Sequence, residues 1–130
     1  MQRIENKLNN LTSANKRLRE AIVSYRAESE NTLYRDALIQ RFEFTFELAW
    51  KTLTEVLREQ GIVLAIISPK SVLKEAYGAG YIQDEKIWMQ MIEDRNAMSH
   101  IYQEEEAGRI AEEICMRYGK MFTQLLKALL

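Results

Sequence analysis

Apolar residues recur at gaps of three and four over most of the chain, which is the spacing of one face of an α-helix. The first helix is predicted over residues 2–26 and carries one narrow apolar seam: Ile4, Leu8, Leu11, Leu18, Ile22 and Tyr25. Asn15 fills the missing place in this seam, and we expect it to be a polar core residue that sets the register. Residues 27–31 are a polar connector, and Asn31 or Thr32 is expected to cap the next helix.

The second helix is predicted over residues 32–60, and Gly61 stands where a left-handed C-terminal cap is expected. Its apolar surface is wider than one stripe because four further large residues add to the seam: Phe44, Phe46, Leu48 and Trp50. A helix this apolar in a small bundle is expected to touch two neighbours, one of them from another subunit. We therefore expect a homodimer.

Three charged residues of this second helix, Glu43, Glu47 and Lys51, follow one another at i, i+4 spacing. Such a line fits a solvated ladder of ion pairs. The ladder is the favoured interpretation from the sequence, and the lining of a cleft stays open as the alternative.

The second half of the chain is predicted to hold a short helix and two longer ones. Residues 61–67 (GIVLAII) are expected to pack as an extended cover, and Ser68-Pro69 then opens a short helix that ends at Gly78 and Gly80. The next helix starts after Asp84, and its expected inner face comprises Ile87, Trp88, Met91, Ile92, Arg95, Met98 and Ser99. An acidic run at 103–106 suits the start of the last helix, whose seam is Ile110, Ile114, Tyr118, Met121, Leu125 and Leu129.

With one proline and five glycines, the chain has few of the turn residues that an all-β fold needs. The pattern predicts an all-α protein: an antiparallel four-helix up-and-down bundle with an additional short helix. We find no linker, so residues 1–130 are expected to form a single domain.

Charge and cysteine usage narrow the function classes. Eighteen basic residues against nineteen acidic ones argue against a general nucleic-acid coat protein, and no DNA partner is expected. Cys115 is the only cysteine, so an internal disulfide is excluded, and with one histidine the chain has too few ligands for a structural zinc site. The polar start and the lack of a long apolar run predict a cytoplasmic protein without a membrane partner.

Most of the reactive side chains gather in residues 88–102 (WMQMIEDRNAMSHIY), which hold the only histidine. The imidazole of His100 can take a proton at neutral pH, and the guanidinium of Arg95 can stabilise a phosphoryl transition state. Together they suffice, without metal or cofactor, to cleave RNA through its 2′-hydroxyl. Asn96 could orient the imidazole, and Ser99 could bind the phosphate or the helix backbone. Arg95 and His100 lie about 140° apart around a helix, so their heads converge through the length of arginine or through two copies across a dimer axis.

A purely structural interpretation of the same residues is available. A histidine near a helix C-terminus commonly caps it, and Arg95 could pair with Glu93, Asp94 or a glutamate on another helix. The chain has no glycine-rich phosphate loop, no paired catalytic aspartates and no HExxH, so we do not expect it to transfer nucleotides by itself.

Three blocks carry a family resemblance: QRFEFTFELAWKTL (40–53), SPKSVLKEAYGAGYI (68–82) and EDRNAMSHIY (93–102). In this order they resemble the HEPN superfamily, and within it the branch called nucleotidyltransferase substrate-binding proteins or HepT-like toxins. The resemblance implies a helical bundle that dimerises, with two R-x4-H sites facing each other across a cleft.

The resemblance also implies site residues and partners. Members with R-x4-H are typically metal-independent ribonucleases, and Arg95 and His100 match those two positions, with Asn96 at the polar position that follows the arginine. Tyr102 matches the tyrosine of R-x4-H-x-Y, to which a minimal nucleotidyltransferase, encoded nearby as the antitoxin, attaches AMP.

Three functions follow as hypotheses. The first is an RNA-cleaving toxin that is inhibited by AMPylation of Tyr102, and the intact motif favours it. The second is a non-catalytic subunit that presents a substrate to a partner nucleotidyltransferase. The third is a structural bundle in which His100 only caps a helix.

Overall fold

The computed structural model describes the backbone of residues 2–100 and 103–130 and the side chains of residues 3–98 and 103–130. Within these residues the elements are all helical, in the order α1 (Gln2–Ala27), α2 (Thr32–Glu59), α3 (Pro69–Gly78), α4 (Glu85–His100), α5 (Glu104–Glu113), the π-helical turn η1 (Ile114–Tyr118) and α6 (Gly119–Leu129). Since α5, η1 and α6 follow one another without a break, they form the predicted last helix. The all-α prediction is confirmed.

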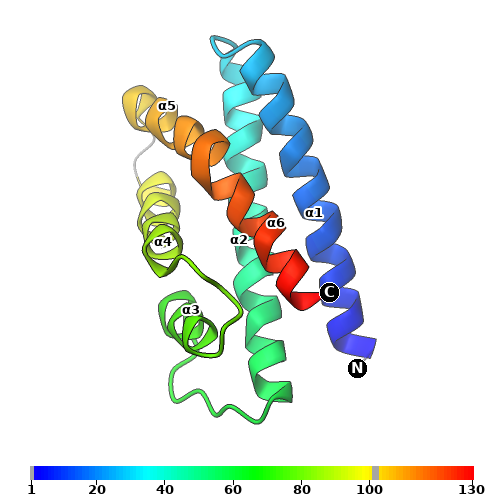
Figure 1. The fold of residues 1–130 in the computed structure, drawn as a ribbon. Helices are drawn as coiled ribbons and strands as arrows, with labels where there is room; N and C mark the ends of the chain where they lie inside the picture. The colour runs from blue at the N-terminus through cyan, green and yellow to red at the C-terminus, as the bar shows by residue number, and fades with distance from the viewer. Residues whose placement is uncertain (1, 101–102) are drawn as a thin grey trace.

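The long helices α1 and α2 form an antiparallel pair, and α2 lies at the centre of the molecule (Figure 1). It packs against α1, α3, α5 and α6. Its fully buried Phe42 and Phe46 meet aromatic rings from the other side of the core, with Phe42 beside Tyr118 and Phe122, and Phe46 beside Trp88. The core therefore sits between α2 and the second half of the chain.

The ends of the helices follow the caps that the sequence predicts. Asn31 Oδ1 accepts hydrogen bonds from the backbone amides of Leu33 (2.9 Å) and Tyr34 (3.2 Å), which satisfies two free donors at the start of α2. Gly61 ends the same helix with φ +81°, a left-handed conformation that favours glycine. Ser68 caps α3, with Pro69 as its first residue.

The predicted seam of α1 is buried, including its polar member. Asn15 is buried, and its Nδ2 lies 3.5 Å from Thr123 Oγ1 on α6. Asn15 is therefore a polar core residue that faces α6, and its role in setting the register stays a prediction.

One expectation about apolar surface is wrong in part. Residues 61–67 do not cover the bundle as a whole, because Ile62 and Leu64 pack against the core while Val63 is 91% exposed and Ile66 and Ile67 are also exposed. Alternate side chains of an extended segment point in opposite directions, which accounts for exposed Val63 between Ile62 and Leu64, and the backbone then bends at residues 65–66, so that Ile66 and Ile67 no longer follow this alternation. On α2, Phe44 is 61% exposed.

The last helix contains a turn that the sequence did not predict. At η1 the backbone amide of Gly119 bonds to the carbonyl of Ile114, five residues earlier, instead of four. The Cys115 carbonyl in this turn accepts a hydrogen bond of 2.9 Å from Arg26 Nη2 on α1. No helix in the described part of the chain is long and apolar enough to cross a membrane.

Candidate functional site

Arg95 projects from α4 towards α2 and is half-buried, with 28% of its side chain exposed. Its guanidinium carbon lies 5.9 Å from the centre of the Phe46 ring, and the head group forms an ion pair with Glu47. Its Nη1 also lies 3.4 Å from Asn96 Oδ1. The partner of Arg95 is therefore a glutamate on another helix, one of the options that the sequence left open.

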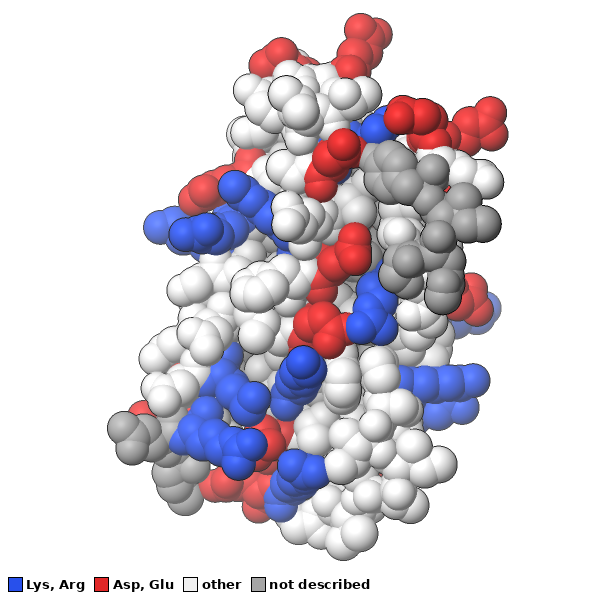
Figure 2. All heavy atoms as spheres, turned by 180° about the vertical axis from the view of Figure 1, so that it is seen from behind, with Lys and Arg blue, Asp and Glu red and all other residues white. Residues whose placement is uncertain are grey.

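The line of charges on α2 lies at this arginine. Glu47 accepts a hydrogen bond from Trp50 Nε1 (3.2 Å), and Lys51 Nζ is 3.7 Å from the same carboxylate. Glu43 is half-buried, and burial raises the pKa of its carboxyl, while the positive charge of Arg95 acts in the opposite direction. Seen from behind, where α6 no longer covers α2, acidic and basic side chains are intermixed along the middle of the molecule (Figure 2). Glu43 and Glu47 thus lie near Arg95. Glu47 also forms an i, i+4 ion pair with Lys51, as in a ladder of ion pairs.

The other predicted site residues cannot be placed beside Arg95. Ser99 and His100 lie outside the described side chains, although α4 extends to His100. Tyr102 lies outside the described residues altogether.

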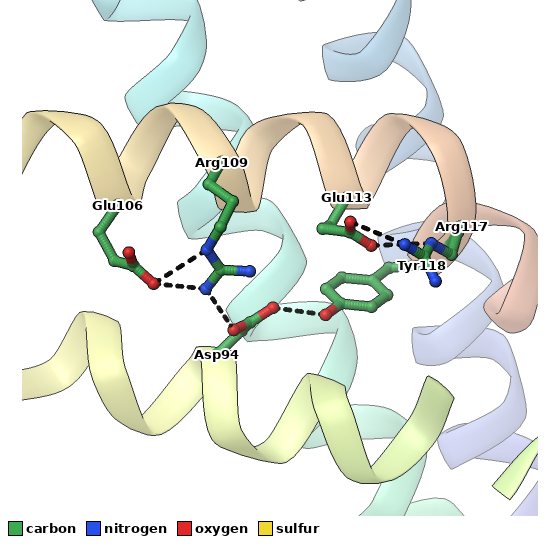
Figure 3. Close-up of polar contacts among 6 residues, drawn as sticks. All are labelled: Asp94, Glu106, Arg109, Glu113, Arg117 and Tyr118. Atoms are coloured by element: carbon green, nitrogen blue, oxygen red, sulfur yellow. Dashed lines mark hydrogen bonds and ion pairs between the residues drawn. The ribbon is translucent and has the colours of Figure 1, made fainter. Parts of the chain in front are cut away.

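A cluster around Asp94 was missed by the sequence analysis. Asp94 is only 5% exposed, although it directly precedes Arg95. One of its carboxylate oxygens accepts a hydrogen bond from the hydroxyl of Tyr118, and the other accepts one of 2.7 Å from Arg109 Nη2 (Figure 3). Arg109 also donates to Glu106 one turn earlier on α5, with Nε at 3.0 Å.

The spacing of α4 contained a signal for this cluster. Asp94 follows Met91 by three residues and precedes Met98 by four, so it lies on the buried line of the helix. The expected inner face passed over it because aspartate is rarely buried unless it is paired. Its partners Arg109 and Tyr118 come from the last helix, and only the fold brings them to it.

The electrostatics of the cluster keep its charges fixed. Burial raises the pKa of Tyr118, and the hydrogen bond to Asp94 and the negative charge of this carboxylate raise it further. The hydrogen bonds to Glu106 and Asp94 raise the pKa of Arg109. Tyr118 therefore stays a neutral donor and Arg109 a cation throughout the ordinary pH range.

The fold and the placement of Arg95 can now be compared with known proteins. The family model described as nucleotidyltransferase substrate binding protein like matches residues 6–130, and the chain belongs to this family, as the resemblance of its three sequence blocks predicts.

Relatives and solved structures agree with this assignment. A Haemophilus influenzae protein described as a probable ribonuclease HepT is 34% identical over 79 residues, which is 58% of this chain and 54% of that protein, so the match spans about half of the relative. A solved structure from Haemophilus influenzae, described as revealing the fold of a substrate binding domain of a nucleotidyltransferase, has a TM-score of 0.81 at 25% identity over 94% of this chain and 98% of the other. A Shewanella oneidensis HEPN toxin, described as tri-AMPylated and in complex with an MNT antitoxin, shares the fold with a TM-score of 0.76 at 18% identity, over 97% and 95% of the two chains.

Proposed function

We propose that this protein is the toxin of a toxin–antitoxin pair and acts as a metal-independent endoribonuclease with Arg95 and His100 as its catalytic residues. The observation that carries the proposal is the placement of Arg95. Its guanidinium is held over Phe46 in a half-buried position and is paired with a carboxylate that a phosphate can replace. The family assignment and the likeness to a probable ribonuclease support the same activity.

The reaction follows from the two side chains. The imidazole of His100 takes the proton of a ribose 2′-hydroxyl, and the 2′-oxygen attacks the adjacent phosphorus. Arg95 stabilises the additional negative charge on the phosphoryl oxygens. The bond to the 5′-oxygen then breaks and this oxygen takes up a proton, which leaves a 2′,3′-cyclic phosphate and a 5′-hydroxyl end. Asn96 and Ser99 are supporting residues that orient the imidazole and bind the phosphate.

Glu43, Glu47 and Lys51 line the cleft in this proposal. Glu47 occupies the guanidinium of Arg95 in the absence of RNA, and an incoming phosphate replaces it. Lys51, 3.7 Å from Glu47, can hold the displaced carboxylate.

Regulation is proposed to act through Tyr102 and a partner. A minimal nucleotidyltransferase encoded nearby transfers AMP to the Tyr102 hydroxyl, two residues from His100, and the added nucleotide blocks the RNA site by its bulk and charge. The active form is a homodimer, with two sites facing one cleft. The description of the Shewanella toxin as AMPylated and bound to its antitoxin supports this part.

RNA cleavage by the purified protein in the presence of EDTA tests the catalytic proposal. We expect wild type to cleave, and Arg95→Ala and His100→Ala to lose about 100-fold or more of the rate. Arg117→Ala, which removes an exposed arginine from an i, i+4 pair with Glu113, should cleave at the wild-type rate. Undiminished cleavage by His100→Ala would show that the histidine is not the base.

Intact-mass measurement after co-expression with the neighbouring nucleotidyltransferase tests the regulation. We expect wild type to gain the mass of one or more AMP groups and to lose RNA cleavage, and Tyr102→Phe to gain none. A mass increase that persists in Tyr102→Phe would place the modification elsewhere.

The second candidate function is a non-catalytic substrate-binding subunit of a two-component nucleotidyltransferase. The description of the Haemophilus influenzae structure as a substrate binding domain favours it. The absence of cleavage by the unmodified protein over a broad RNA panel, with binding to the nucleotidyltransferase retained, would support this candidate against the nuclease.

A further inference from the structure

The Asp94 cluster is a polar connection between three elements, in which Asp94 and Tyr118 are buried and Arg109 is partly exposed. Asp94 belongs to α4, Arg109 to α5, and Tyr118, which has no exposed surface, to η1. A carboxylate buried this deeply is unfavourable unless partners replace its water, and here each of its oxygens has one. Replacing a buried ion pair by apolar side chains of similar volume is often neutral or stabilising, so an ion pair of this kind is weak evidence of a purely stabilising role.

Arg109 joins the two helices on either side of the segment that contains Tyr102. It binds Asp94 on α4 and Glu106 in the first turns of α5, and α4 ends at His100 while α5 begins at Glu104. The ends of both helices are therefore fixed relative to each other through one guanidinium.

Tyr118 supports Arg95 by a second route, through the rings beneath it. Its ring is stacked on Phe42 with 5.4 Å between the centres, and Phe42 lies 6.2 Å from Phe46, over which the guanidinium of Arg95 is placed. One tyrosine thus holds the backbone of Arg95 through the neighbouring Asp94 and helps to hold the surface on which its head group rests. The π-helical turn determines the direction of the Tyr118 side chain, because the additional residue in the turn rotates the side chains at its end.

We infer that Asp94, Arg109 and Tyr118 are positioning residues that fix α4 so that Arg95 meets the phosphate of the substrate at the proposed nuclease site. The inference rests on the proposed function. A buried carboxylate with a partner at each oxygen favours one arrangement of the helices over shifted ones, and small displacements of a group that stabilises the transition state reduce the rate strongly. None of the three is proposed to touch the RNA.

Steady-state cleavage of one RNA by conservative variants tests the inference. Tyr118→Phe removes the hydroxyl and keeps the ring, and Asp94→Asn keeps the shape and removes the charge. We expect kcat to fall about tenfold in Tyr118→Phe and further in Asp94→Asn, with KM within about twofold of wild type, because phosphate binding remains while alignment is lost. Arg109→Lys, which keeps a cation, should retain more kcat than Arg109→Gln. Arg117→Lys, on the same continuous helix and with no contact to Asp94, is the matched control and should behave as wild type.

A loss of kcat that follows the unfolded fraction, measured by circular dichroism on the same samples, would overturn the inference, as would wild-type kcat in folded Asp94→Asn. Amide hydrogen exchange of the peptide covering residues 92–98 provides a readout without RNA. We expect faster exchange there in Tyr118→Phe and Asp94→Asn but not in Arg117→Lys; unchanged exchange would overturn the inference. If wild type fails to cleave RNA while the exchange changes as expected, the proposed nuclease fails and the positioning of α4 stands.

Discussion

Glu43 carries a carboxyl in a half-buried place on α2, near the positive charge of Arg95. Burial raises its pKa above the ordinary value of 4.5, so the folded state binds the proton more tightly than the unfolded state does. Its contribution to stability is complete below the unfolded pKa and is lost as pH rises through the higher folded pKa. At neutral pH the charged group destabilises the fold.

Glu43→Gln should therefore raise the thermal midpoint at pH 7, and this gain should shrink as the pH falls through the pKa of Glu43 in the folded protein. Thermal unfolding followed by circular dichroism measures this difference in thermal midpoint from pH 7 down to about pH 4, which is near the ordinary pKa of a glutamate. Glu30→Gln, in the exposed turn after α1, is the control. A gain that is the same at every pH would mean that the charge of Glu43 is not its cause.

The sequence predicts a site contact well when the partners are close in the sequence, and poorly when they lie on distant helices. The half-burial of Arg95 follows from its place on the helical period, and its pairing with a glutamate from another helix was among the options. The role of Asp94 does not follow, because its partners Arg109 and Tyr118 lie 15 and 24 residues away on the last helix. Periodicity shows which side of a helix a residue occupies, whereas the partner it meets there depends on how the helices pack.

At the scale of elements, local chemistry predicts where helices begin and end, and tertiary packing decides what happens within them. Asn31, Ser68 and Gly61 act within a few residues of their own positions, so the bounds of α2 and the start of α3 were predicted well. The π-helical turn has no such local signal. It lies where α6 approaches α1 closely, at Gly119.

Gly119 gives the sharpest test of this approach. A Cβ added there would lie 2.8 Å from Ile22 Cδ1 on α1 and 3.2 Å from the Ile114 carbonyl oxygen. Alanine gains about 1 kcal/mol over glycine within a helix, but overpacking costs about 1–3 kcal/mol, so we expect Gly119→Ala to destabilise the protein by about 1 kcal/mol. Gly108→Ala in α5, where a Cβ meets nothing within 4 Å, should instead stabilise it by about 1 kcal/mol.

Urea unfolding measures the free energy of unfolding of Gly119→Ala and Gly108→Ala, which should change in opposite directions. Ile22→Val removes the clashing Cδ1 atom. In the Ile22→Val background, Gly119→Ala should therefore cost less than half of the free energy of unfolding that it costs in wild type. If Gly119→Ala stabilises the protein as much as Gly108→Ala does, the packing of α6 on α1 is looser than the structure shows.

At the scale of the whole molecule, one face of α2 is not covered by any helix in the part of the chain that the structure describes. Phe44 is 61% exposed on it, and Leu48, one turn later on the same side, is only half-buried. Glu47 and Lys51 belong to this side of the helix, so the aromatic side chain lies next to the proposed site. A second copy of the chain that covers this face by two-fold symmetry would bring two sites together.

We therefore predict a dimer in which Phe44 is an anchor of the interface. Wild type should sediment at twice the mass of one chain at micromolar concentration, and Phe44→Glu should weaken association at least tenfold, since truncating a central aromatic anchor commonly costs about 2 kcal/mol or more. Val63→Glu, at a more exposed apolar residue of the connector between α2 and α3, should leave the mass unchanged. Because Arg95 and His100 diverge by about 140° around one helix, cleavage that needs groups from both copies should decline with the dimer fraction in Phe44→Glu. Monomeric wild type would contradict the dimer, and a fully dimeric Phe44→Glu would place the interface on another face.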